Sequence, residues 1–103
     1  MKKQESPVRL SCYIKVFLII YKVHMLQGKQ YECRGTLTSL ENNLQDSDFF
    51  RVHSAYLVNL EHIERIMENG FILVENTTIP IAQKRMQDFK RVYMEYIRGY
   101  FNT

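Results

Sequence analysis

The sequence predicts one mainly β domain that contains a short internal helix and ends in a longer helix. The chain has 103 residues, of which 46% are hydrophobic, and it contains only four Gly and two Pro. This length and composition suffice for a single core, and they exclude both a multidomain enzyme and a disordered chain. Short runs of Val, Ile, Tyr and Phe separated by turn residues favour strands, and a helical period occurs only in one short internal stretch and in the last fifth of the chain.

The first third of the chain has a β-type composition. Residues 8–35 are rich in Val, Ile, Tyr and Phe, and the interruption at Gln27-Gly28-Lys29 predicts a hairpin turn. The apolar run Leu18-Ile19-Ile20 is compatible with a core strand and with an exposed protein interface, and the sequence leaves both open. We expect strands near residues 10–16, 19–26 and 29–35.

A short helix is predicted from Thr38 to Leu44. Leu37, Leu40 and Leu44 recur at helical spacing. Thr38 and Glu41 have the spacing of a capping box, in which the hydroxyl and the carboxylate each bond a free backbone N–H at the start of a helix.

β-type composition returns at residues 49–60. His53 and Ser54 interrupt this segment between two apolar runs, where a loop would expose them to solvent. The residues that alternate onto a predicted core face are Phe50, Val52, Tyr56 and Val58.

Three more short strands are expected after this segment. Asn69-Gly70 between apolar runs is a strong hairpin signal, so we place strands at residues 63–67 and 71–75 around it. A second turn at Asn76-Thr77 precedes a strand at residues 78–81.

The end of the chain is amphipathic and basic. Met86, Phe89 and Tyr93 begin a stripe at steps of three and four residues, which predicts a helix from about Gln83 to Arg98. Residues 83–103 contain five basic and two acidic side chains, which accounts for the whole net charge of +3. A basic surface suits a polyanion such as nucleic acid, although on charge alone a solvated helix face is the better explanation.

The sequence has no catalytic signature. Cys12 and Cys33 form no Cys-x-x-Cys pair, the three histidines lack metal-binding spacing, and the four glycines stand alone. We therefore expect two free buried thiols, no metal, no cofactor and no enzymatic activity. The longest apolar run has six residues and no signal-peptide pattern is present, so we expect no membrane span and a cytoplasmic location.

The segment from Phe49 to Leu60, read with Ile63 to Met67 and Ile79 to Lys84, resembles the LytTR family of bacterial DNA-binding domains. The shared features are an Arg-x-His step, a Tyr-Leu-Val-Asn-Leu run and an Ile-Pro-Ile entry to the C-terminal segment. The resemblance implies an elongated fold of stacked antiparallel sheets, with loops that read successive major grooves of double-stranded DNA. We expect residues 8–103 to form the DNA-binding domain, and the composition of residues 1–7 indicates the remnant of a linker.

The resemblance also implies a function and partners. We expect the output domain of a transcription regulator, such as a two-component response regulator, with a receiver or sensor domain upstream and a homodimer on repeated DNA sites. The DNA-binding residues that it suggests are His53, Ser54, Gln83, Lys84, Arg85, Tyr21 and Lys22.

The chain departs from the family pattern at some of these positions. Ser54 stands where the family commonly has Arg or Asn, and Ala82-Gln83 replaces the preferred Ser-Arg. Either ring nitrogen of His53 could donate to guanine or phosphate, and Gln83 could read adenine through two hydrogen bonds. The alternative is an interaction or dimerisation module of the same fold with reduced base readout.

Overall fold

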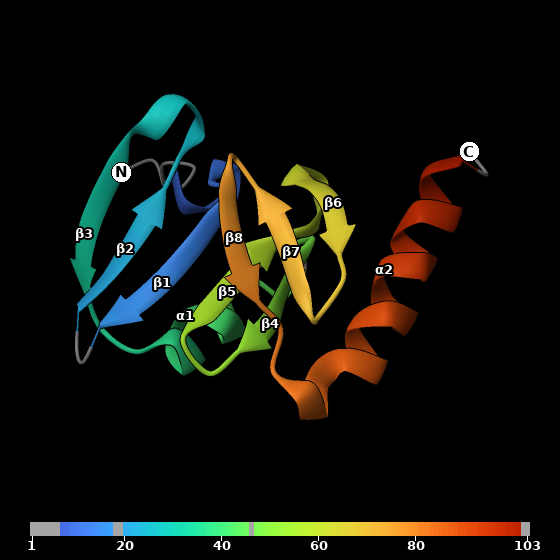
Figure 1. Cartoon of the computed structure of the whole chain (residues 1–103). Coiled ribbons are helices and arrows are strands. Elements are labelled where there is room, and N and C mark those ends of the chain that lie inside the picture. Colours follow the sequence, from blue (N-terminus) through green and yellow to red (C-terminus); the bar gives the residue numbers. More distant parts are fainter. Residues whose placement is uncertain (1–6, 18–19, 46, 102–103) are drawn as a thin grey trace.

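Two antiparallel sheets and a C-terminal helix form the fold in the computed structural model, which describes residues 7–17, 20–45 and 47–101 (Figure 1). The five-stranded sheet has the order β3-β2-β1-β5-β4, and the three-stranded sheet has the order β6-β7-β8. This arrangement confirms the mainly β class with one short internal helix and one terminal helix. The elements are β1 (Tyr13–Phe17), β2 (Ile20–His24), β3 (Gln30–Arg34), α1 (Leu37–Asn43), β4 (Phe49–His53), β5 (Tyr56–Asn59), β6 (Ile63–Met67), β7 (Phe71–Val74), β8 (Thr77–Pro80) and α2 (Met86–Phe101), with 3₁₀ turns η1 (Pro7–Leu10), η2 (Leu26–Gly28), η3 (Leu60–His62) and η4 (Gln83–Arg85).

The five-stranded sheet contributes to a hydrophobic cluster on each of its two faces. Ile14 and Leu57 point from one face into a cluster that Leu37 and Leu40 of α1 complete. The other face contributes Val58 and its neighbours to a second cluster, which is shared with the three-stranded sheet. Helix, sheet and sheet are therefore stacked, and the principal extents of 39 × 33 × 26 Å give a moderately elongated molecule.

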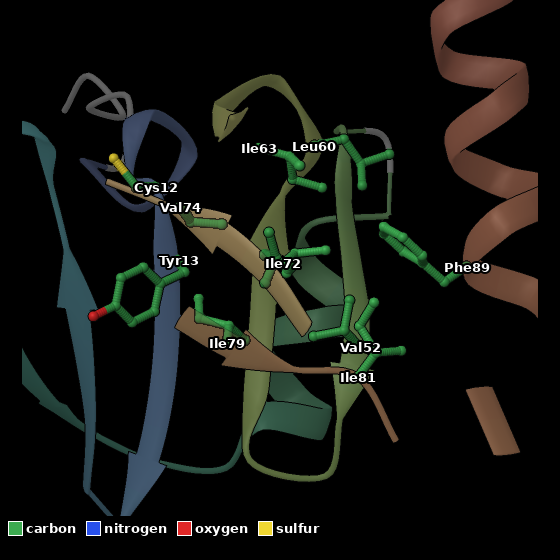
Figure 2. Close-up of a cluster of buried hydrophobic side chains, with 11 residues drawn as sticks. Cys12, Tyr13, Val52, Leu60, Ile63, Ile72, Val74, Ile79, Ile81 and Phe89 are labelled. Carbon is green, nitrogen blue, oxygen red and sulfur yellow. The ribbon is translucent and has the colours of Figure 1, made fainter. Parts of the chain in front are cut away.

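The second cluster is the larger core, and Figure 2 shows how its side chains converge from both sheets and from α2. Phe89 reaches into it from the first turns of α2 and is fully buried. Of the predicted core residues, Val52 and Val58 are fully buried, whereas Phe50 and Tyr56 are half-buried and pack against the cluster. The ring of Phe89 therefore attaches α2 to the rest of the domain.

The helix cap differs from the prediction. The hydroxyl of Thr36, not that of Thr38, accepts a hydrogen bond from the backbone N–H of Ser39 at 3.1 Å, so α1 begins at Leu37. Starting the helix one residue earlier buries Leu37 together with Leu40. Glu41 is consequently not a capping residue, and its carboxylate instead bonds Arg51 at 2.9 Å.

Turn chemistry sets the remaining boundaries. Asn69 and Gly70 both have positive φ and join β6 to β7, as predicted. The next turn lies at Glu75 and Asn76, which also have positive φ, one position before the predicted turn. Thr77 pairs with Val74 and so already belongs to β8.

The predicted early strands are longer than the observed ones. Residues 7–10 form a 3₁₀ turn and β1 begins only at Tyr13. In the apolar run at residues 18–20, Ile20 opens β2 and is half-buried, whereas Leu18 and Ile19 lie outside the described residues. Both thiols are free, but only Cys12 is buried as predicted, because Cys33 is half-buried.

Candidate nucleic-acid interface

A bulge near the end of β4 decides where His53 points. In the pairing of β4 with β5, Arg51 lies opposite Leu57 but His53 lies opposite Tyr56, so Val52 is an extra residue. Such a bulge re-aims the side chains beside it. Because residues opposite each other share a face of the sheet, His53 lies on the face of Tyr56, and the two ring centroids are 5.8 Å apart in an edge arrangement.

His53 is the last residue of β4, whereas the sequence predicted it in a loop. Ser54 occupies the turn and is exposed, whereas His53 is half-buried. The backbone N–H of Ala55 donates a hydrogen bond of 3.0 Å to Nδ1 of His53. In the neutral ring the hydrogen therefore sits on Nε2. Only Nε2 can then donate to a ligand, whereas the sequence had left both ring nitrogens as possible donors.

The chain entry to α2 lies directly beside the end of β4. The backbone N–H of Ala82 donates to the carbonyl of Val52 at 2.8 Å, and Nη1 of Arg85 donates to the carbonyl of Arg51 at 3.3 Å. Gln83 and Lys84 are exposed in the 3₁₀ turn η4 that begins there. Two predicted segments about thirty residues apart in the sequence thus meet at one edge of the molecule. We call the four residues His53, Ser54, Gln83 and Lys84 the corner.

Arg85 is placed differently from its neighbours. It is half-buried, and its guanidinium is directed at the backbone of β4. Its position helps to hold the two segments together.

Tyr21 and Lys22 are adjacent on β2 and therefore lie on opposite faces of the sheet. Tyr21 packs against the cluster beneath α1, and burial together with the neighbouring Cys33 raises the pKa of its hydroxyl. Lys22 is exposed on the other face. The structure therefore places Lys22, but not Tyr21, on the face that carries His53.

Two basic residues that the sequence did not single out accompany Lys22. Lys15 on β1 lies opposite both Lys22 and Tyr56, and its Nζ is 5.7 Å from the centroid of the Tyr56 ring. Arg34 lies on the same face at the end of β3, opposite Ile20. We call the exposed side chains Lys15, Lys22 and Arg34 the basic band.

The basic band runs from the neighbourhood of the corner across the sheet to β3. Glu32 lies within it, with Oε2 3.9 Å from Nζ of Lys22. Because both side chains of this pair are about half exposed, the pair adds at most about 1 kcal/mol, and Lys22 stays available to a stronger anion. Strand alternation in residues 13–17 could have identified Lys15, but only the pairing of the strands shows that it is near His53.

The residues that the structure describes contain neither a cluster of metal-ligand side chains nor a helix that could span a membrane. Among these residues no three His, Cys, Asp or Glu side chains are grouped as metal ligands would be. In the same residues no helix is long and apolar enough to cross a membrane.

The two stacked antiparallel sheets, the short internal helix and the terminal helix define the class of the fold as a mainly β domain. Residues 13–94 match the sequence profile of the LytTr DNA-binding domain, and the chain belongs to this LytTR family. The family is one of DNA-binding domains and not of enzymes, and its members are typical output domains of response regulators.

Similar proteins support the same assignment. A sensory transduction protein LytT of Bacillus subtilis is 31% identical over 67 residues, which cover 60% of this chain and 28% of that protein. A protein of the same name from Bacillus anthracis is 25% identical over 105 residues, covering 89% of this chain and 43% of that protein. The chain thus spans less than half the length of these two relatives.

A solved structure shows the same fold. The LytTr DNA-binding domain of a Bacillus cereus protein superposes with a TM-score of 0.72, covering 84% of both chains at 22% sequence identity. At this identity the match concerns the arrangement of the sheets and helices.

Proposed function

We propose that this chain binds double-stranded DNA in a sequence-specific manner and that the corner reads base edges in a major groove. The observation that carries the proposal is the 2.8 Å hydrogen bond from Ala82 to Val52, which joins the two segments of the corner on one edge. Sequence reading needs several polar side chains that converge on neighbouring base pairs. His53, Ser54, Gln83 and Lys84 supply such polar side chains from the two segments that this bond joins.

Each corner residue has a different capacity for readout. The amide of Gln83 both donates and accepts, so it can pair with N6 and N7 of adenine, while Lys84 can donate to O6 or N7 of guanine or to a phosphate. Nε2 of His53 can donate one hydrogen bond. Ser54 can donate or accept one, which makes it the most adaptable and the least selective of the four.

The basic band supplies affinity that does not depend on sequence. Lys15, Lys22 and Arg34 are exposed on the face of His53, where they can neutralise phosphates and release counterions. The longest extent of the domain, 39 Å, exceeds one helical turn of DNA, about 34 Å. The domain is therefore comparable in length to one helical turn of the duplex.

The proposal extends to the full protein. The chain covers 28% and 43% of two relatives that are both named sensory transduction proteins. We propose that it acts as the output domain of a cytoplasmic two-component response regulator, joined to a receiver or sensor domain.

A selection experiment tests the base readout. The purified domain selects binding sites from a random duplex library, and fluorescence anisotropy then compares the selected duplex with a scrambled one. Replacing Gln83 with Ala should weaken binding to the selected duplex by about 1–3 kcal/mol and relax preference at one base position. Gln87, exposed on α2 outside the corner, provides the matched Gln→Ala control and should leave the preference unchanged.

A salt series tests the basic band. The logarithm of the binding constant should fall linearly with the logarithm of salt concentration, and Lys15→Ala or Lys22→Ala should each reduce the slope by about 0.9. The exposed Lys90 of α2 is the matched Lys→Ala control. A library that yields no preferred sequence, with a flat salt response and a size that grows with protein concentration, would reject DNA readout in favour of an interaction module.

A further inference from the structure

Arg51 makes an unusual set of contacts for a strand residue next to the corner. Its Nε donates to the carbonyl of His53 at 3.1 Å, and its Nη2 donates to the carbonyl of Ser54 at 2.8 Å. Its Nη1 donates to Oε1 of Glu41 at 2.9 Å. All three guanidinium nitrogens are therefore used, and the side chain is only 14% exposed.

These contacts come from the side of the sheet opposite the basic band. Arg51 lies opposite Leu57, whose side chain belongs to the cluster under α1, so the guanidinium is on the α1 face. His53 and Tyr56 share the other face. Arg51 thus supports the turn from behind and is not itself positioned to contact the ligand that the corner binds.

The two carbonyls that Arg51 bonds determine the conformation of Ser54. The carbonyl of His53 belongs to the peptide plane before the Cα of Ser54, and the carbonyl of Ser54 belongs to the plane after it. Because peptide units are planar, fixing both planes fixes φ and ψ of Ser54 and the direction of its Cα–Cβ bond, from which the hydroxyl extends. The same planes orient the N–H of Ala55, which bonds Nδ1 of His53 and so sets the orientation of the imidazole.

Arg51 is fixed in turn by α1. Glu41 lies on α1, and the helix is anchored to the sheet by the buried Leu37 and Leu40. The carbonyl of Arg51 also accepts the hydrogen bond from Arg85, which brings the entry to α2 against β4. One residue therefore connects α1, the β4–β5 turn and the segment that carries Gln83 and Lys84.

We infer that Arg51 is a positioning residue that holds the β4–β5 turn in the conformation required for selective DNA readout, with Glu41 orienting its guanidinium. The inference rests on the proposed function of the corner. The planar fork of Arg is required, because a Lys ammonium cannot direct separate donors at two carbonyls and a carboxylate in fixed geometry. Lys nevertheless retains the charge and the aliphatic stem.

The test compares Arg51→Lys with Arg65→Lys, a matched change at an exposed position of β6 in the other sheet. Arg51→Lys should reduce affinity for the selected duplex by about tenfold, the effect of a lost base contact. Affinity for the scrambled duplex and the salt slope should stay the same, because no phosphate contact is removed. Arg65→Lys should change neither affinity. A folded Arg51→Lys variant that keeps its selectivity within about twofold of the parent would overturn the inference.

A second measurement is independent of DNA. The amide signals of Ser54 and Ala55 in ¹⁵N-resolved spectra should shift in Arg51→Lys, and the Ala55 amide should exchange faster, while signals from β6 and β7 stay in place. If Arg51→Lys does not fold, Glu41→Gln takes its place, and unchanged Ser54 and Ala55 signals in that variant would overturn the inference. If the parent protein selects no duplex, the proposed function fails, and the amide signals alone decide whether Arg51 shapes the turn.

Discussion

Replacing Phe89 with Ala tests how strongly the terminal helix is coupled to the core. Phe89 is fully buried, and its ring centroid lies 6.0 Å from that of Phe50 and 5.6 Å from that of Tyr93. A Phe→Ala change in a core costs about 3–5 kcal/mol, because lost burial is combined with the cost of a cavity. We expect about 4 kcal/mol, since both aromatic contacts are lost and the surrounding sheets cannot easily close the gap.

Urea unfolding followed by far-ultraviolet circular dichroism measures this change. Domains of this size have a total stability of about 5–15 kcal/mol, so the variant should still fold, with a Tm lower by roughly 15–30 °C. Met94→Ala on the same helix is the control, because Met94 is 55% exposed, and it should change the free energy of unfolding by less than about 0.5 kcal/mol. A loss below about 1.5 kcal/mol for Phe89→Ala, with an unchanged dependence on urea, would refute the role of this ring.

Two further predictions concern the titratable groups His24, on β2, and Cys12, which directly precedes β1. Burial, with Lys22 and Lys15 nearby, lowers the pKa of His24 below its ordinary value of 6.5, so the unfolded chain binds this proton more readily than the folded chain. The free energy of unfolding should therefore decrease as pH falls below about 6.5 and level off below the folded-state pKa. The variant His24→Gln should weaken this pH dependence. Identical pH profiles of the free energy of unfolding for parent and variant would contradict the assignment to His24. Burial, followed by the nearby Glu75 and Glu64, raises the pKa of the Cys12 thiol to about 11. A thiol reagent at mildly alkaline pH should therefore titrate Cys33 in the native protein and Cys12 only in denaturant, and prompt native reaction of two thiols would show that Cys12 is accessible.

Elements whose formation depends on residues close together in the sequence were predictable from the sequence. Asn69-Gly70 supplies the two positive φ angles of a tight hairpin, so the β6–β7 turn was located correctly. The spacing of Leu37, Leu40 and Leu44 indicated a helix there, and the change of period near Met86 indicated α2. In each case the signal lies within a few residues and does not require knowledge of the fold.

The helix cap shows where local signals stop being sufficient. Thr36 and Thr38 are both chemically able to cap α1, and the capping-box pattern favoured Thr38. The packing of Leu37 and Leu40 against the sheet selected Thr36, which freed Glu41 to pair with Arg51. That choice depends on the position of the helix on the sheet, and the cap sequence does not contain this information.

By itself the sequence determined the β-rich class and the family, because these follow from local turn chemistry, hydrophobic period and a long motif, and it singled out all four corner residues as candidates. Only the tertiary structure decided that the segments carrying His53 and Gln83 lie side by side, that Lys15 faces the same side as His53 while Tyr21 does not, and that Arg51 bonds the β4–β5 turn. These relations depend on strand register, where a single extra residue such as Val52 changes which side chains share a face. Register results from packing among strands that are far apart in the chain, so no short stretch of sequence specifies it.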